Sequence, residues 1–518
     1  MSSPWLAAVP PVLVLIGVGV VLAVFAASKP SVASDTSALA KVDMPLGGGT
    51  LVSATATGPN GRAIPVTFTG NRIVPRVKLR PSERVSITAV VSRPGWIGWL
   101  AGSRNTERLT VTTPTASLKD QYLTLASGAP LRLSFSHAIS TFAYGQPGSL
   151  THRTLAQPQT SVTVPRPALA GTMAIAAAPR TWERASTTFV TWFPAGAPTS
   201  AVTSPTPGKT IRPTTPITLT FSKPYASILG GHMPTISSNP TGRWASLNSH
   251  TLVFKPSGYG YGLGTTVGIG LPHGVQVVGG HAAWTVPTGS SLRVNEILAQ
   301  LGYLPLSWAP SSAQVAPTTA AQLRAAISPP SGQFSWKWGN TPSTLQGQWD
   351  PNHQTVVTQG ALMAFEQDQG MYGTQPGPAQ VWHALIGAAI KDQRSSFGYT
   401  YVMVSEASPE SLTLWHSGRT IMTTPVNTGI PGAATALGTY PVFEHITSGT
   451  MSGTNPDGSH YSDAGIPWIS YFNGGDALHG FIRGSYGSPQ SLGCVEMPFA
   501  TAGRVYPYTP IGTLVHVA

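Results

Sequence analysis

The sequence predicts a mainly β protein of several domains, preceded by one apolar helix. The chain has 518 residues, which is too long for a single hydrophobic core. Glycine (56) and proline (48) are abundant while only 9% of the residues are charged, and this composition favours short strands joined by turns. Many short runs also alternate apolar and polar residues, which is the pattern of a half-buried strand.

The N-terminal segment from Trp5 to Ala27 contains no charged residue and is long enough to cross a hydrocarbon core as a helix. A signal peptide is the alternative, because Val24-Phe25-Ala26 offers a small-residue cleavage site, but no Lys or Arg precedes the segment. We therefore expect residues 1–43 to form a transmembrane anchor and a short tether. The protein would then be a single-pass protein of the cell membrane. The expectation that its C-terminal body lies on the extracytoplasmic side rests on the chemistry implied by the C-terminal residues and not on this segment. Lys29 follows the segment, so the positive-inside rule gives this orientation no support.

Strand patterns separated by Gly and Pro follow the tether. They predict a β-sandwich module, a second β module and a third module that resembles bacterial immunoglobulin-like domains, at residues 44–113, 114–203 and 204–293. Such modules usually act as spacers, so no chemistry is assigned to them. The aromatic turn Trp96-Ile97-Gly98-Trp99-Leu100 is expected to pack onto the first sandwich, with an exposed aromatic contact as the alternative.

Residues 294–395 change to helical patterns. Thr358 is expected to cap a helix, and Pro378 is expected to occupy the first turn of another. The stretch 359–385 resembles the three-helix peptidoglycan-binding module, although Glu366 and Gln380 depart from its pattern and residues 307–352 look like an insertion. A plain helical linker domain is the alternative.

The net charge of +12 is unevenly distributed. From residue 396 to the end there are three Lys/Arg and seven Asp/Glu, against 27 and 11 in the preceding part. A basic stalk would attract anionic wall polymers or lipid headgroups, and a generally solvated basic surface is the alternative. Nucleic acid is not expected, because no basic run or helix-turn-helix pattern occurs. No metal or other cofactor is expected either, since no His-Glu-x-x-His, cysteine pair or phosphate-binding glycine motif is present.

The single cysteine, Cys494, follows the turn Ser491-Leu492-Gly493 and lies fifteen positions after His479. A thiol attacks as its thiolate, so a catalytic cysteine needs a nearby base, and His479 is the candidate. The amides of Leu492, Gly493 and Cys494 are candidates for stabilising an oxyanion. A small buried cysteine beside an ordinary histidine is the alternative. The loop-like surroundings favour a reactive group.

Residues 396–518 resemble the catalytic domain of the L,D-transpeptidases, the cysteine enzymes that cross-link peptidoglycan. The family signature falls on His479-Gly480 and on Ser491-Leu492-Gly493-Cys494-Val495, and the flanking segments match the opening and closing strands. Leu492 departs from the signature, because most members carry a second histidine there. Glu496 is the other departure: it stands where arginine or asparagine is common, and it puts a negative charge near the site.

The resemblance implies that Cys494 attacks the third residue of a peptidoglycan stem peptide, with His479 as general base and then acid. The terminal D-alanine would leave, and an amine of a neighbouring stem would open the acyl-enzyme to form a cross-link. Ser491, Leu492, Gly493 and Gly480 would position the substrate and the oxyanion. An L,D-carboxypeptidase using the same residues and a wall-binding structural protein with a degenerate site remain as alternatives.

Overall fold

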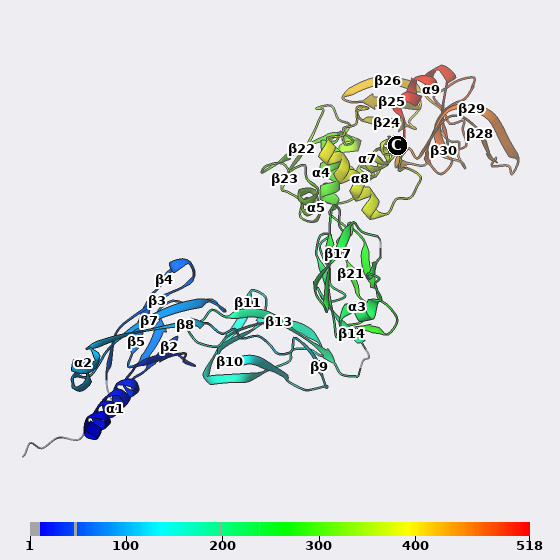
Figure 1. Cartoon of the computed structure of the whole chain (residues 1–518). Coiled ribbons are helices and arrows are strands. Elements are labelled where there is room, and N and C mark those ends of the chain that lie inside the picture. The colour runs from blue at the N-terminus through cyan, green and yellow to red at the C-terminus, as the bar shows by residue number, and fades with distance from the viewer. Residues whose placement is uncertain (1–10, 46–48, 197–198, 238) are drawn as a thin grey trace, which may run out of the picture. The chain divides into compact units, whose positions relative to one another are not determined.

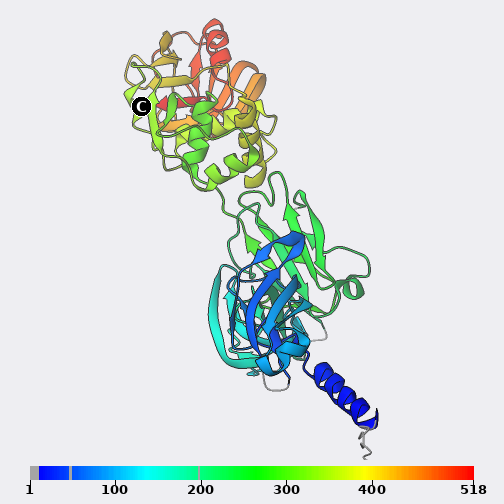
Figure 2. The ribbon, with the colours of Figure 1, turned by 60° about the vertical axis from the view of Figure 1, so that its left-hand side comes forward.

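The computed structural model describes residues 11–45, 49–196, 199–237 and 239–518 (Figures 1 and 2). The chain forms two compact units. The first comprises Met1–Val202, Thr220–Tyr225 and Gly274–Val278, and the second comprises Thr203–Leu219, Ala226–His273 and Gly279–Ala518.

The N-terminal helix α1 spans Pro11–Ala27. Residues 5–10 of the predicted spanning segment lie outside the described residues. Among the residues that are described, no helix has both the length and the apolar character needed to cross a membrane.

The predicted tether differs from the structure. Residues 28–43 contain β1 (Ser31–Ala33) and β2 (Ala40–Asp43), which pair antiparallel. Leu39 and Val42 are buried in the core of the first module. This segment therefore belongs to the sandwich, because its apolar residues complete the core.

The first module consists of two four-stranded sheets, with strand orders β1-β2-β6-β5 and β4-β3-β7-β8. Strand β7 shows the alternation that predicted it, since Val85, Ile87, Ala89 and Val91 are buried and the residues between them are not. The remaining elements are β3 (Thr50–Thr57), η1 (Pro59–Gly61), β4 (Ala63–Ile64), β5 (Val66–Thr69), β6 (Arg72–Pro75), β7 (Arg84–Ser92), α2 (Gly95–Ala101) and β8 (Arg104–Thr112).

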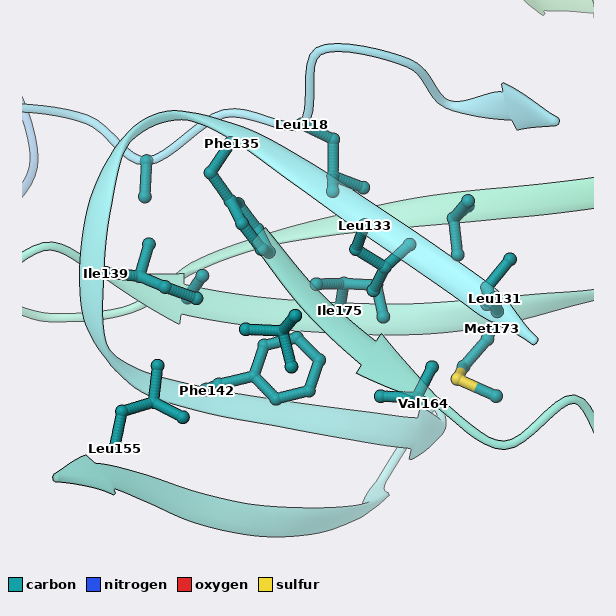
Figure 3. Close-up of a cluster of buried hydrophobic side chains, with 14 of the residues drawn as sticks. Leu118, Leu131, Leu133, Phe135, Ile139, Phe142, Leu155, Val164, Met173 and Ile175 are labelled. Carbon is teal, nitrogen blue, oxygen red and sulfur yellow. The ribbon is translucent and has the colours of Figure 1, made fainter. Parts of the chain in front are cut away.

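A five-stranded sheet in the order β11-β10-β12-β13-β9 forms the second module. Figure 3 shows its core, in which Phe135, Ile139 and Phe142 of one long strand meet Ile175 of a neighbouring strand. The strands are β9 (Tyr122–Leu125), β10 (Leu131–Gln146), β11 (Ser149–Val164), β12 (Gly171–Ala178) and β13 (Ser186–Pro194).

Short strands also dominate residues 199–285. Strands β16, β19 and β21 form a three-stranded sheet, and β17 pairs antiparallel with β18. The elements are β14 (Thr199–Ser204), β15 (Ile217–Phe221), α3 (Tyr225–Leu229), β16 (Thr235–Ile236), β17 (Gly242–Asn248), β18 (Thr251–Pro256), β19 (Thr266–Gly270), β20 (Val275–Val277) and β21 (Ala283–Thr285).

The predicted helical region contains helices and one small hairpin. Helix α4 packs against α5, α7 and α8. Pro378 begins α8, as predicted, but Thr355 rather than Thr358 caps α7, and the Thr358 hydroxyl instead donates to Asn295 Oδ1 at 2.9 Å. The elements are α4 (Ser291–Gln300), β22 (Leu306–Pro310), α5 (Thr319–Ile327), β23 (Gly332–Trp336), α6 (Ser343–Gln346), α7 (Val356–Asp368) and α8 (Pro378–Lys391).

Two sheets build the C-terminal domain, in the orders β26-β25-β24-β32-β27 and β28-β29-β30-β31. Buried side chains from both sheets, including Val402, Leu414, Leu478 and Val495, form one core. The elements are β24 (Thr400–Ser405), β25 (Ser411–His416), β26 (Arg419–Pro425), β27 (Gly438–Pro441), β28 (Glu444–Thr454), β29 (His460–Asn473), β30 (Asp476–Gly480), β31 (Val495–Met497), α9 (Phe499–Val505), η2 (Tyr506–Tyr508) and β32 (Leu514–Val517). The predicted mainly β, multidomain architecture is confirmed.

Candidate active site

Strands β30 and β31 bring the predicted catalytic residues together. They pair in parallel, with Leu478 opposite Val495 and His479 opposite Glu496. Leu478 and Val495 are buried in the domain core. Because side chains alternate along a strand, His479 and Glu496 project from the opposite face of the sheet. Cys494 directly precedes β31, two positions before Glu496, and therefore shares that face.

His479 and Cys494 line the same cavity, which has a volume of about 980 Å³. Leu492 and Glu496 line it as well. The β28–β29 hairpin contributes another wall, including Met451 of β28. The predicted nucleophile and base thus face one space that is large enough for a peptide segment.

The backbone carbonyl of the next residue fixes the tautomer of the His479 imidazole. Its side chain is 2% exposed, and Nδ1 lies 3.0 Å from the carbonyl oxygen of Gly480. A carbonyl can only accept, so Nδ1 carries the proton and Nε2 keeps its lone pair. Burial lowers the pKa of His479, opposed by the Gly480 carbonyl and by Glu496. The imidazole is therefore neutral near neutral pH and able to accept a proton.

The Cys494 thiol also keeps its proton at rest. Burial raises the pKa of Cys494 to about 12; the Ala477 amide opposes this shift, while the carboxylates of Asp476 and Glu496 add to it. The sulfur lies 3.5 Å from the carbonyl oxygen of Gly475, which a protonated thiol can contact as a donor. The sequence argument expected a base that lowers the thiol pKa. Instead, burial favours a neutral thiol and a neutral imidazole, both facing one cavity, so the proton must move during attack.

The turn before Cys494 is fixed by hydrogen bonds. The buried Ser491 hydroxyl donates to the carbonyl oxygen of Cys494 at 2.5 Å, and the Gly493 amide donates to the same hydroxyl oxygen at 3.2 Å. The Gly493 amide is thus engaged inside the turn. Among the described residues, the amides of Leu492 and Cys494 make no such bond, so these two remain the candidates for stabilising an oxyanion.

Glycine is required at two of the predicted positions. Gly493 has φ +113°, and a Cβ there would lie 2.4 Å from Asp476 Oδ1. A Cβ on Gly480 would lie 2.9 Å from Phe499 Cδ1. At both positions the absence of a side chain lets the backbone pass close to a neighbouring side chain, Asp476 at Gly493 and Phe499 at Gly480.

A segment that the sequence analysis did not assign to the site holds the cysteine turn in place. Asn427 is fully buried; its Nδ2 donates to Ser485 O at 3.0 Å, and its Oδ1 accepts from the Gly487 amide at 3.0 Å. The carbonyl of Thr428 accepts from the Ser491 amide at 2.9 Å. We call residues 427–430 the strap. The sequence shows the pair Asn427-Thr428, but nothing in it connects this pair to residues sixty positions later.

Arg483 is a second residue that the sequence analysis missed. Its Nε and Nη2 donate to the two carboxylate oxygens of Glu496 at 2.7 and 2.8 Å. The negative charge predicted near the site is therefore paired, and Arg483 itself lines the cavity beside His479.

Comparison with known protein families covers the residues of this site. Residues 399–517 match the model of the YkuD family, the L,D-transpeptidase catalytic domain. These residues contain both strands of the site and the turn between them. The C-terminal part of the chain is therefore a domain of the L,D-transpeptidase catalytic type.

Several solved L,D-transpeptidase structures are similar. One from Mycobacterium smegmatis has 12% identity over 62% of this chain and 99% of its own, with a TM-score of 0.21. L,D-transpeptidase 3 from Mycobacterium tuberculosis has 12% identity over 61% of this chain and 97% of its own, also with a TM-score of 0.21. The catalytic domain of the E. faecium L,D-transpeptidase has 23% identity over 23% of this chain and 96% of its own, with a TM-score of 0.22. No curated protein matches the chain.

Proposed function

We propose that the protein is an L,D-transpeptidase that cross-links peptidoglycan stem peptides through an acyl-enzyme on Cys494. The family match at residues 399–517 supports this activity class. The observation that carries the proposal is that Cys494 and His479 line one cavity, with His479 Nδ1 bound to a carbonyl so that Nε2 keeps its lone pair.

The reaction begins when the Cys494 sulfur bonds to the carbonyl carbon of the third stem residue while His479 Nε2 takes the thiol proton. The amides of Leu492 and Cys494 stabilise the oxyanion. His479 then returns the proton to the departing amine of D-alanine, and the thioester remains.

The second half of the reaction regenerates the enzyme. A side-chain amine of a neighbouring stem attacks the thioester carbon and gives a proton to His479. The carbon–sulfur bond breaks, and the sulfur recovers the proton. The product is an amide between two stem peptides. If water attacks instead, the product is a trimmed tripeptide.

The test is incubation of the full-length protein with disaccharide-tetrapeptides, followed by mass analysis. Cross-linked dimers are expected, and a carbapenem should add covalently to Cys494. Cys494→Ala should abolish turnover, and His479→Ala should nearly abolish it. Leu492→His should be tolerated, because the role assigned to Leu492 belongs to its backbone amide.

The alternatives predict other products from the same incubation. Tripeptides without dimers would indicate a carboxypeptidase. Unchanged substrate together with an unmodified thiol would indicate a degenerate site on a wall-binding protein.

The proposed substrate also bears on the location of the protein. Stem peptides of the cell wall lie outside the cytoplasm, so the C-terminal domain would act on the extracytoplasmic side of the cell membrane. Membrane attachment through the N-terminal segment and attraction of the basic stalk to anionic wall polymers are parts of this proposal.

A further inference from the structure

The short helix α2, which connects β7 and β8 in the first unit, presents two tryptophans to solvent. Ile97 is 3% exposed, whereas Trp96 is 55% and Trp99 is 80% exposed. The sequence analysis expected this turn to pack onto the sandwich. The structure shows that Ile97 attaches the helix and that the two indoles point away from the core.

The exposed indole of Trp99 offers mainly apolar contact. Its Nε1 donates to the carbonyl oxygen of Trp96 at 2.9 Å, so the polar atom of the ring is already used within the helix. The interfacial region of a bilayer accepts indoles of this kind. The apolar contact that Trp99 offers therefore suits lipid.

The net positive charge around α2 also favours a lipid partner. Residues 28–113 contain eleven Lys/Arg and four Asp/Glu. Arg104 and Arg108, on β8 directly after α2, are exposed. Aromatic side chains next to exposed arginines are a combination that suits anionic headgroups.

The apolar helix α1 lies in the same unit. Val18, Val20 and Leu22 are 51%, 56% and 61% exposed. Figure 1 shows α1 and α2 toward the same end of the first unit. Contact of this end of the module with a lipid surface would explain why both α1 and α2 expose apolar side chains there.

We propose that α2 is a membrane-surface contact: Trp96 and Trp99 insert into the interfacial region of an anionic bilayer while Arg104 and Arg108 face its phosphates. This contact is separate from the catalytic chemistry and does not depend on it. It would hold the first module against the membrane surface.

The single cysteine allows a direct test in the full-length protein. In a Cys494→Ser background, Gly95→Cys places one thiol on α2, where an added Cβ has no atom within 4 Å. Gly339→Cys, also with no atom within 4 Å, is the matched control in the second unit. Each thiol is labelled with a polarity-sensitive dye, and the protein is mixed with phosphatidylethanolamine/phosphatidylglycerol vesicles. We expect at least a threefold loss of iodide quenching at position 95 and none at position 339.

A Trp96→Ser/Trp99→Ser variant should restore quenching at position 95. Both side chains are exposed, so its thermal midpoint should be unchanged and would show that the variant folds. Equal quenching at the two positions on vesicles, or protection that survives loss of both tryptophans, would overturn the proposal. Protection by soluble glycan strands without lipid would also overturn it and would assign the indoles to carbohydrate.

Discussion

The charge states of two side chains determine how the proposed reaction can start. Burial raises the pKa of Cys494 to about 12 and lowers the pKa of His479. Both shifts favour the uncharged pair over a thiolate–imidazolium pair. Nucleophilicity therefore arises only when a substrate carbonyl is in place and the proton passes to His479.

Alkylation by iodoacetamide tests this resting state. Because the reagent needs thiolate, and the pKa of Cys494 lies well above neutrality, modification should be slow at pH 7 and should accelerate about tenfold per pH unit up to pH 9. Mass spectrometry of the labelled protein over time gives the rate. His479→Ala should leave this slope unchanged. Fast alkylation that does not vary between pH 6 and pH 9 would instead show a preformed ion pair.

The Arg483–Glu496 pair provides a second residue-scale prediction. The Glu496 side chain is only 6% exposed, against 29% for Arg483, so Arg483→Gln leaves a nearly buried carboxylate without its partner. We expect a loss of about 1–3 kcal/mol in the free energy of unfolding, measured by chemical denaturation. Arg504→Gln, at an exposed position of α9, is the control and should change little. Adding Glu496→Gln should recover part of the loss, and no recovery would mean that Arg483 acts through packing alone.

At this scale the sequence located the candidate residues better than it described their surroundings. The signature placed Cys494, His479 and the turn between them, because the spacing of these residues is local. Arg483 was not predicted, since its importance arises only when β30 and β31 pair and bring Glu496 beside it. The raised pKa of the thiol was not predicted either, because burial depends on the β28–β29 hairpin and on the rest of the cavity wall.

Among the elements, the strap is the clearest example of a short segment with a large effect on the site. Residues 427–430 form isolated bridges to both sides of the cysteine turn, with Asn427 opposite Glu496 and Gly429 opposite Ser491. The buried carboxylate of Glu410 accepts from the amide and the hydroxyl of Thr428, at 2.7 and 2.8 Å. The turn is thus positioned by this scaffold as well as by its own Ser491 and Gly493.

Removing the Asn427 side chain should loosen that scaffold. Asn427→Ala eliminates the bonds to Ser485 and Gly487, and we expect a loss of about 2–3 kcal/mol in stability together with a lower rate of carbapenem acylation. Denaturation and stopped-flow fluorescence measure the two effects. The exposed Asn352→Ala is the control. Unchanged acylation in a destabilised Asn427→Ala protein would show that the strap supports the fold but not the site.

Element boundaries show which signals sequence reasoning could use. Proline at the start of α8 and the alternation in β7 are local signals, and both predictions held. The tether prediction relied on composition alone, and it missed that Leu39 and Val42 fill a core whose other walls come from distant strands.

In the molecule as a whole, the helical region and the C-terminal domain are in close contact. A Cβ on Gly360 of α7 would lie 2.5 Å from the carbonyl oxygen of Gly512, so the two backbones touch. Tyr372 donates to Phe443 O at 2.6 Å, and Gln348 donates to Thr439 Oγ1 at 2.7 Å. The helices therefore support the sheets of the C-terminal domain.

This contact predicts different behaviour for two fragments. Residues 291–518 should fold stably, whereas residues 396–518 alone should melt roughly 10 °C lower or aggregate, because the surface covered by α7 becomes exposed. Scanning calorimetry of both fragments measures the difference. Gly360→Leu in the longer fragment should reproduce part of the loss, with Gly377→Leu, which has open space around it, as the control. Equal melting temperatures would mean that the contact contributes no stability.

The protonated state of Cys494 also affects how long the protein can persist among oxidants. Peroxides attack thiolates, so a thiol that rarely ionises should form sulfenic acid slowly. The chain has no second cysteine, so no internal disulfide can trap the sulfur. The burial that keeps the Cys494 thiol protonated until a substrate arrives would therefore also protect its sulfur from oxidation.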